Sequence, residues 1–114
     1  MQTTIKQLAH QFFSEIQAIR HHIHAHPELS FQEFETAQFI SNKLNEFGIE
    51  HKTGVAGTGI VALIKGKNPD HNCIALRADM DALPILEAND CSYASKNKGV
   101  MHACGHDVHS ACIT

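Results

Sequence analysis

The sequence predicts an α/β fold in which two helices precede a group of strands. Up to Phe47, apolar residues recur at steps of three and four positions, which is the period of an amphipathic helix. From Ile49 onward the pattern changes to short apolar runs divided by Gly, Asn, Pro and Asp, as strands and turns require. The chain has 114 residues, 43% of them hydrophobic and 18% charged, which suits one globular domain or part of one.

The first helix is expected from about Thr4 to His24 and ends before Pro27. Its apolar stripe consists of Ile5, Leu8, Phe12, Ile16, Ile19 and Ile23. A second helix should follow the segment Ser30 to Glu33, which has the form of a capping box, and run to about Phe47. Gly48 then stands where a left-handed helix terminus is expected.

Two apolar runs, 60–64 and 73–76, are expected to form strands. Because both runs are continuously apolar and not alternating, we expect strands covered on both faces, as in a layered α/β sheet. The glycine-rich segment 54–59 lacks the residue order of a nucleotide-binding loop and is interpreted as a turn between strands. Residues 85–100 are expected to be irregular, and Asp107 is a candidate cap for a last helix.

Composition argues against several classes of protein. The net charge is -3 and the pI about 6.3, with nine dispersed Lys and Arg residues, so no basic surface for nucleic acid is expected. No signal peptide and no membrane-spanning run is visible. We therefore expect a cytoplasmic protein whose four cysteines are reduced, disulfides being the minority interpretation.

The segment 101–109, Met-His-Ala-Cys-Gly-His-Asp-Val-His, is the densest group of metal-ligating residue types in the chain. Cys104 and His106 are the expected ligands, because a thiolate and a neutral imidazole suit zinc or another late divalent ion. The alternative is a partly buried thiol with a surface histidine beside it by chance. His102 and His109 are expected to support such a site from outside or to lie at the surface.

Asp79 and Asp81 follow the second predicted strand and have the same parity, so both can face one side of an extended segment. Such carboxylates can ligate a metal, or can fix the tautomer of a ligand histidine through its second nitrogen. The alternative is a pair of solvated loop aspartates.

A second histidine cluster occupies 21–26, at the end of the first predicted helix. His22 and His26 are four apart and share a helix face, which would allow them to grip an ion. Because Pro27 ends the helix there, we favour a structural role in which some of these imidazoles bond to loop backbone.

Several motifs together resemble the metal-dependent amidohydrolases of the aminoacylase and carboxypeptidase superfamily. The most similar branch contains hippurate hydrolase, plant auxin-conjugate hydrolases and N-acetyldiaminopimelate deacetylase. The resemblance covers about His10 to Thr114. Its motifs are Arg20, His24-Ala-His-Pro-Glu-Leu29, Glu33, Glu35-Thr36, Arg77-Ala-Asp-Met-Asp-Ala-Leu-Pro84 and Met101-His-Ala-Cys-Gly-His-Asp-Val-His109.

The resemblance implies a three-layer α/β/α catalytic domain with a mixed central sheet. Residues 1–114 would be its N-terminal part, and the rest of that domain and a lid or dimerisation domain would lie outside this chain. It also implies a pair of divalent metal ions, with zinc, manganese, nickel and cobalt not distinguished. The Cys and the next His of the H-A-C-G-H-D motif are ligands in this branch, which carries over to Cys104 and His106. The wider superfamily has a His-x-Asp pair where Asp79 and Asp81 stand, so the usual histidine is replaced by Asp79.

The expected function is hydrolysis of the amide bond of small N-acyl or N-aroyl amino acids by the intact enzyme, for which a homodimer is one expected state. The resemblance implies that the general-base glutamate and further ligands follow Thr114, so the chain alone is expected to be inactive. One alternative is a non-catalytic metal-binding or regulatory module. Another is a cysteine hydrolase that uses Cys104 with His106 or His109 as its base. Chelation of the metal separates these interpretations.

Overall fold

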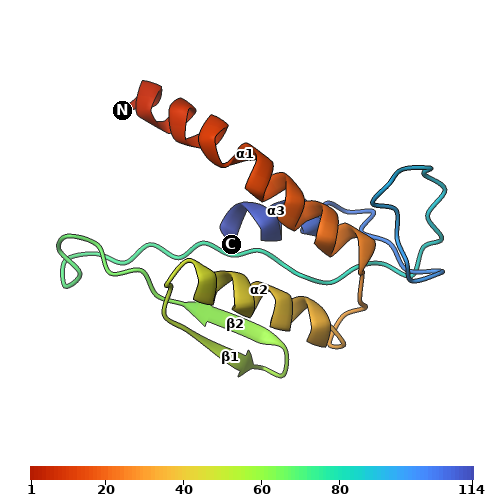
Figure 1. Ribbon diagram of the computed structural model, residues 1–114. Coiled ribbons are helices and arrows are strands. Elements are labelled where there is room, and N and C mark those ends of the chain that lie inside the picture. Colours follow the sequence, from red (N-terminus) through yellow and green to blue (C-terminus); the bar gives the residue numbers. More distant parts are fainter.

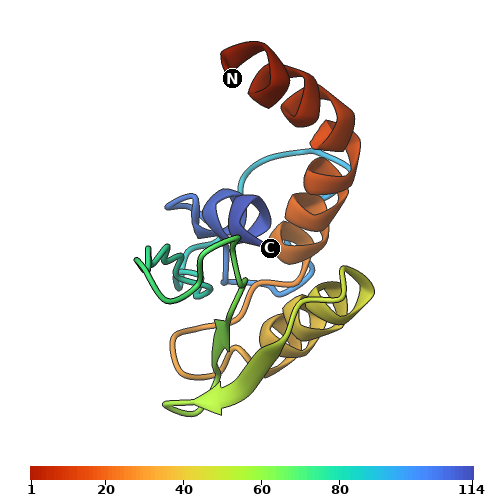
Figure 2. The same cartoon turned by 90° about the vertical axis from the view of Figure 1, so that its left-hand side faces the viewer.

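The computed structural model describes all residues, 1–114, and contains three helices and one small sheet (Figure 1). In chain order the elements are α1 (Gln2–Ala25), α2 (Phe34–Glu46), β1 (His51–Val55), β2 (Gly59–Ala62) and α3 (His106–Ile113). In both views α1 and α3 lie together, and α2 lies with the β1–β2 hairpin below them (Figures 1 and 2). None of the helices is long and apolar enough to cross a membrane.

The hydrophobic core joins the three helices. It consists of Ile19, Ile23, Ile40, Leu44 and Ala111, with Ile16, Phe39, Ile49, Ile60 and Met80 packed against it. Only the C-terminal part of the α1 stripe is buried: Ile23 is 1% exposed, whereas Leu8 is 46% and Ile5 59% exposed. The N-terminal part of α1 accordingly projects beyond the rest of the molecule (Figure 1).

The predicted second helix is confirmed as α2, but the predicted capping box is wrong. Glu33 directly precedes the first residue of α2, and its side chain makes no capping hydrogen bond. The Glu28 carboxylate instead accepts hydrogen bonds from the backbone amides of Glu35, at 3.1 Å, and Thr36, at 2.6 Å. Glu33 accepts a hydrogen bond from the Thr58 hydroxyl at 2.8 Å, which ties the start of α2 to the hairpin turn. A residue outside the expected motif therefore satisfies the free amides of the helix.

The C-terminus of α2 follows the prediction. Gly48 has φ 69°, its amide donates to the Asn45 carbonyl, and the Ile49 amide donates to the Leu44 carbonyl at 2.8 Å. This pair of bonds is the Schellman arrangement, in which glycine adopts the left-handed conformation without steric cost. Ile49 and Leu44 both contact the core, so the turn also starts the hairpin in the right direction.

The sheet is an antiparallel hairpin of β1 and β2, with 56–58 as its turn. The predicted strand at 60–64 is thus present in shortened form, and the segment 54–59 connects the strands as expected. The predicted strand at 73–76 is wrong, because these residues form no strand and Ile74 is 87% exposed. Burial of β2 on both faces is wrong as well, since Val61 is 58% exposed. An apolar run becomes a strand only where a neighbouring backbone pairs with it, and no segment of residues 1–114 pairs with 73–76 as a strand.

Residues 63–105 form no helix or strand, in agreement with the irregular structure expected at 85–100. Two isolated bridges hold this segment: Leu29 pairs with Ala82 in parallel, and Leu83 pairs with Met101 in antiparallel orientation. The second bridge brings the residues after Met101 next to the residues before Leu83. The α/β class is confirmed, with helices and a partial sheet, and this local pairing creates the site described next.

Candidate metal centre

Cys104 and His106 lie together at the start of α3. The Cys104 Sγ and His106 Nε2 atoms are 3.6 Å apart. Gly105 between them has φ 100° and precedes the first residue of the helix, so the left-handed turn folds the two neighbouring side chains toward each other. Cys104 is exposed and the His106 side chain is 21% exposed, which leaves the pair accessible from solvent.

Asp81 holds the opposite side of the His106 ring. The Nδ1 atom donates to the Asp81 carboxylate at 2.9 Å and to the Asp81 carbonyl at 3.0 Å. In the neutral ring, a proton on Nδ1 leaves the lone pair on Nε2, on the side of Cys104. A carboxylate that fixes the ring of a histidine in this way is the usual outer partner of a metal-ligating imidazole.

The donor set and its spacing fit a late divalent ion. Zinc binds cysteine sulfur at about 2.3 Å and histidine nitrogen at about 2.05 Å, and at a tetrahedral angle these donors are about 3.6 Å apart. The Cys104 and His106 donors have this separation. No group of three or more His, Cys, Asp and Glu side chains in residues 1–114 is arranged to hold an ion. The chain therefore provides two ligands and an orienting carboxylate.

Asp79 does not join this group. Its carboxylate is 49% exposed and accepts hydrogen bonds from Arg77 at 2.9 and 3.1 Å. Its backbone carbonyl accepts a hydrogen bond from the Ser110 hydroxyl at 2.9 Å, which attaches α3 to the segment before Asp81. The two aspartates thus have different environments, although both were expected to face one side.

The remaining histidines of the motif differ from each other. His109 is exposed, and its ring centroid is 6.4 Å from that of His106. His102 is only 4% exposed, and neither of its ring nitrogens bonds a protein group. Burial, with the nearby His24 and His106, lowers the pKa of His102 below its ordinary value, although Asp107 and Asp81 oppose this. The His102 ring is therefore neutral near pH 7, close behind the candidate ligands.

Asp107 was expected as a helix cap and has a different role. Its carboxylate, 1% exposed, makes no capping bond and instead accepts hydrogen bonds from His24 at 2.8 Å and from Arg20 at 3.0 Å. Arg20 and His24 are four residues apart on α1, so their spacing was a sequence signal that both face one neighbour. Glu87, which bonds His24 from the other side, gave no such signal because it lies in the irregular segment.

The histidine cluster 21–26 is integrated into the fold. His21 stacks on Tyr93 with ring centroids 3.8 Å apart, and His22 stacks on Phe39 at 3.9 Å. The His26 Nδ1 atom donates to the His22 carbonyl at 2.8 Å. This carbonyl lies within α1, so the bond is to helix backbone and not to the loop backbone that was expected.

Comparison with known proteins agrees with these motifs. A family model described as Peptidase family M20/M25/M40 matches residues 75–114. The chain is 50% identical to an N-acyl-L-amino acid amidohydrolase of Geobacillus stearothermophilus and 48% identical to a hippurate hydrolase of Campylobacter jejuni. These alignments cover 96% and 87% of this chain, and 29% and 26% of the relatives.

A solved structure gives the same result. The YxeP protein of Bacillus subtilis, a dinuclear metal binding peptidase from the M20 family, superposes with a TM-score of 0.85 and 48% sequence identity. The match covers 90% of this chain and 29% of that protein. The chain thus spans less than a third of the length of the relatives it matches. In sequence and in fold, the chain is similar to the N-terminal part of proteins of the M20/M25/M40 peptidase family.

Proposed function

We propose that residues 1–114 form the N-terminal part of the catalytic domain of a metal-dependent amidohydrolase. The intact protein would hydrolyse the amide bond of N-acyl or N-aroyl amino acids. The names of two relatives, an N-acyl-L-amino acid amidohydrolase and a hippurate hydrolase, support this substrate class. The dinuclear metal binding neighbour supports the use of divalent ions.

The observation that carries the proposal is the Cys104–His106–Asp81 arrangement. Cys104 Sγ and His106 Nε2, 3.6 Å apart, would hold one divalent ion, and Asp81 would keep the His106 lone pair directed toward it. A bound divalent ion supplies electrophilic polarisation of the amide carbonyl and activation of water. Asp79, which is exposed and paired with Arg77, would act on this site through the backbone position of Asp81 and α3.

Metal binding by the chain tests this arrangement. We expect Co²⁺ to bind the purified chain with a thiolate-to-cobalt absorption band, because cysteine sulfur would be a ligand. Cys104→Ser should abolish the band, and His106→Ala should weaken binding strongly. The matched control is His109→Ala, an exposed histidine on the same helix, which should retain the band. Loss of the band in His109→Ala but not in His106→Ala would refute the assigned ligands.

Turnover is expected only from a longer protein. Because the chain provides two ligands and no further group suited to an ion, it should bind the metal without hydrolysing hippurate or N-acetyl amino acids. Reproducible hydrolysis by the metal-loaded 114-residue chain would contradict the proposal that residues 1–114 carry only part of the catalytic site.

A second candidate function is a cysteine hydrolase. The same geometry favours it, because an exposed thiol lies 3.6 Å from an imidazole whose other nitrogen bonds a carboxylate. In an active longer protein the two candidates respond differently to chelation. A metal-dependent enzyme loses activity in EDTA and regains it with added metal, whereas a cysteine hydrolase keeps its activity in EDTA.

A further inference from the structure

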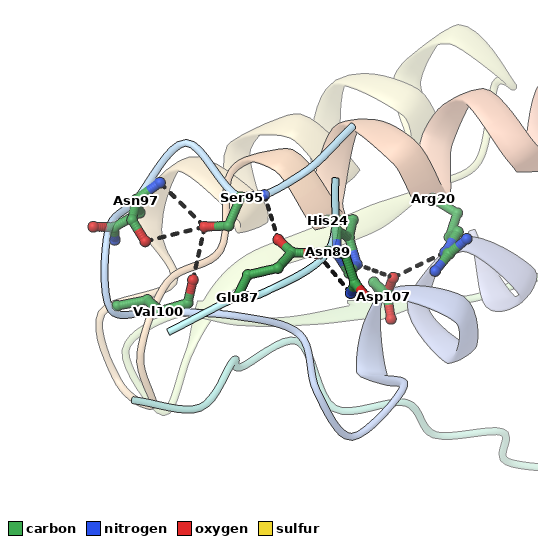
Figure 3. A network of polar contacts seen from close by, with 8 residues as sticks. All are labelled: Arg20, His24, Glu87, Asn89, Ser95, Asn97, Val100 and Asp107. Carbon is green, nitrogen blue, oxygen red and sulfur yellow. Dashed lines mark hydrogen bonds and ion pairs between the residues drawn. The ribbon is translucent and has the colours of Figure 1, made fainter. Parts of the chain in front are cut away.

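Figure 3 shows a network of charged and polar side chains that includes Asp107, the residue directly after the candidate ligand His106. Its central member is His24, near the C-terminus of α1 and only 4% exposed. The His24 Nδ1 atom bonds Asp107 at 2.8 Å, and its Nε2 atom bonds Glu87 at 2.9 Å. His24 thus connects a residue of α3 with a residue of the irregular segment 85–100.

Both carboxylates of this network are ionised near neutral pH. Burial by itself raises the pKa of Glu87, but hydrogen bonds from His24, the Ser95 amide and Asn89 outweigh it and lower that pKa to about 2. Burial likewise raises the pKa of Asp107, and hydrogen bonds from His24 and Arg20 lower it overall. An ionised carboxylate only accepts hydrogen bonds, so Asp107 and Glu87 are acceptors in their contacts with His24.

The network fixes the start of α3. Asp107 directly follows His106 in the first turn of that helix, and its side chain is 1% exposed. Two residues of α1, His24 and Arg20, bond the same oxygen of Asp107. Charge-assisted bonds of this kind are short and directional. These bonds fix where Asp107 lies against α1. Because His106 is the preceding residue, they also fix the His106 backbone and, with it, the distance from His106 to Asp81.

Glu87 connects the network to the loop that leads into the segment 101–109. One oxygen of Glu87 bonds His24, and the other accepts the Ser95 amide at 2.5 Å. The Ser95 hydroxyl in turn donates to the Val100 carbonyl at 2.7 Å, immediately before Met101. Met101 begins the segment that carries Cys104, and it pairs with Leu83. The network thus holds the chain on both sides of the Cys104–His106 pair.

We infer that His24 and Glu87 are positioning residues for the Cys104–His106 site: through Asp107 and Ser95 they fix the two segments that bring the thiol and the imidazole together. This inference rests on the proposed function, since it assigns the network a role at that site. Neither residue contacts the two candidate ligands directly, so their effect is transmitted through α3 and the loop.

Glu87→Gln tests the inference, because it keeps the shape of the side chain and removes its charge. The matched control is Glu33→Gln, the same change at another buried glutamate, which bonds Thr58 in the hairpin turn and no member of the network. We expect Glu87→Gln to weaken Co²⁺ binding by up to about tenfold, less than the loss of a direct partner of a metal ligand because Glu87 acts through α3 and the loop, and Glu33→Gln to leave the affinity unchanged.

A readout without metal makes the test independent of the proposed function. The ¹⁵N resonances of His106 in the metal-free chain report which ring nitrogen carries the proton. In the wild type and in Glu33→Gln we expect the Nδ1–H form, and in Glu87→Gln we expect a mixture of both forms. If the wild type binds no Co²⁺, the proposed function fails. The comparison of the His106 tautomer between Glu87→Gln and the wild type still tests whether Glu87 positions His106.

The inference is overturned if folded Glu87→Gln retains both the wild-type affinity and the wild-type tautomer of His106. Circular dichroism with a thermal transition establishes that the variant is folded. If it is not, Asn89→Ala replaces it, because the exposed Asn89 amide donates to Glu87 at 3.1 Å and its removal is milder. Asn89→Ala should shift the tautomer of His106 in the same direction, and a wild-type tautomer in that variant overturns the inference too.

Discussion

The imidazole of His106 donates from Nδ1 to both the carboxylate and the backbone carbonyl of Asp81, at 2.9 and 3.0 Å. The two residues are 25 positions apart in sequence, and the contact exists because Leu83 pairs with Met101. The carboxylate stabilises the ring in one orientation, and the carbonyl excludes the tautomer that would place the proton on Nε2. In the neutral ring, the direction of the His106 lone pair is therefore a consequence of the fold around Asp81.

Asp81→Asn should weaken Co²⁺ binding by about tenfold or more. The amide oxygen is a weaker acceptor for the Nδ1 proton than a carboxylate, and the amide can turn to present its NH₂ group instead. Titration of the chain with Co²⁺, followed by absorption, measures the change. Asp70→Asn, at an exposed position in the loop after β2, is the control and should bind as the wild type does. Asp79→Asn separates the two aspartates of the motif: a larger loss at Asp79 than at Asp81 would show that the orienting residue is misassigned.

Acid should destabilise the chain through Glu87. Because its pKa is lowered from 4.5 to about 2 in the folded state, Glu87 contributes stability above its unfolded pKa, and this stability is lost as the pH falls through that range. Urea unfolding at several pH values between about 5 and 2 measures the loss. In Glu87→Gln the fall in unfolding free energy over this range should be smaller. Equal pH dependence in both proteins would contradict the lowered pKa.

Gly105→Ala should reduce both stability and metal affinity. Gly105 has φ 100°, which L-residues adopt only with strain, although an added Cβ would meet no atom within 4 Å. Backbone strain alone should lower the unfolding free energy by about 1–2 kcal/mol. Gly66→Ala is the control, since that position has open space and no positive φ, and its change should stay within about 0.5 kcal/mol. Denaturant unfolding of both variants measures the difference.

The parts of the structure that could be predicted from sequence depend on local pattern. The periodic positions of Ile19 and Ile23 predicted α1, and Gly48 predicted the end of α2. The pairing of Cys104 with His106 was also local, because they stand two positions apart. Contacts that depend on tertiary structure were missed: His24 bonds Asp107 across 83 positions and Glu87 across 63. No periodicity in an irregular segment indicates such partners.

The failure at 73–76 has a related cause. A continuous apolar run such as the one around Ile74 indicates a strand only if a partner strand is available. Within residues 1–114 the run has no partner strand and is exposed, so strand propensity alone did not decide its structure. The capping box at Ser30 failed for a different reason, because the Glu28 carboxylate already bonds two amides of the first turn of α2.

Ile23→Ala should be among the most destabilising substitutions in α1. The side chain is 1% exposed and lies in the core between α1 and α2, so its removal should lower the unfolding free energy by about 2–5 kcal/mol. Leu8→Ala, on the same helix but 46% exposed, should change it by less than about 0.5 kcal/mol. Similar effects of the two substitutions would mean that the projecting part of α1 is packed in solution.

The exposed apolar residues after β2 should cause the chain to associate. Ile64, Ile74 and Leu76 are 75%, 87% and 79% exposed, and the backbone of 73–76 pairs with no other segment. Apolar side chains beside unpaired backbone groups are the features that lead to edge-to-edge association. Light scattering after size-exclusion chromatography should therefore show a mass that increases with protein concentration.

Ile74→Lys should shift the chain toward the monomer without lowering its thermal midpoint, because the side chain makes no core contact. Ile5→Lys, at a 59% exposed position on α1, is the control and should leave the association unchanged. A monomeric wild type at all concentrations would contradict this account, and rescue by Ile5→Lys alone would show that association occurs through α1.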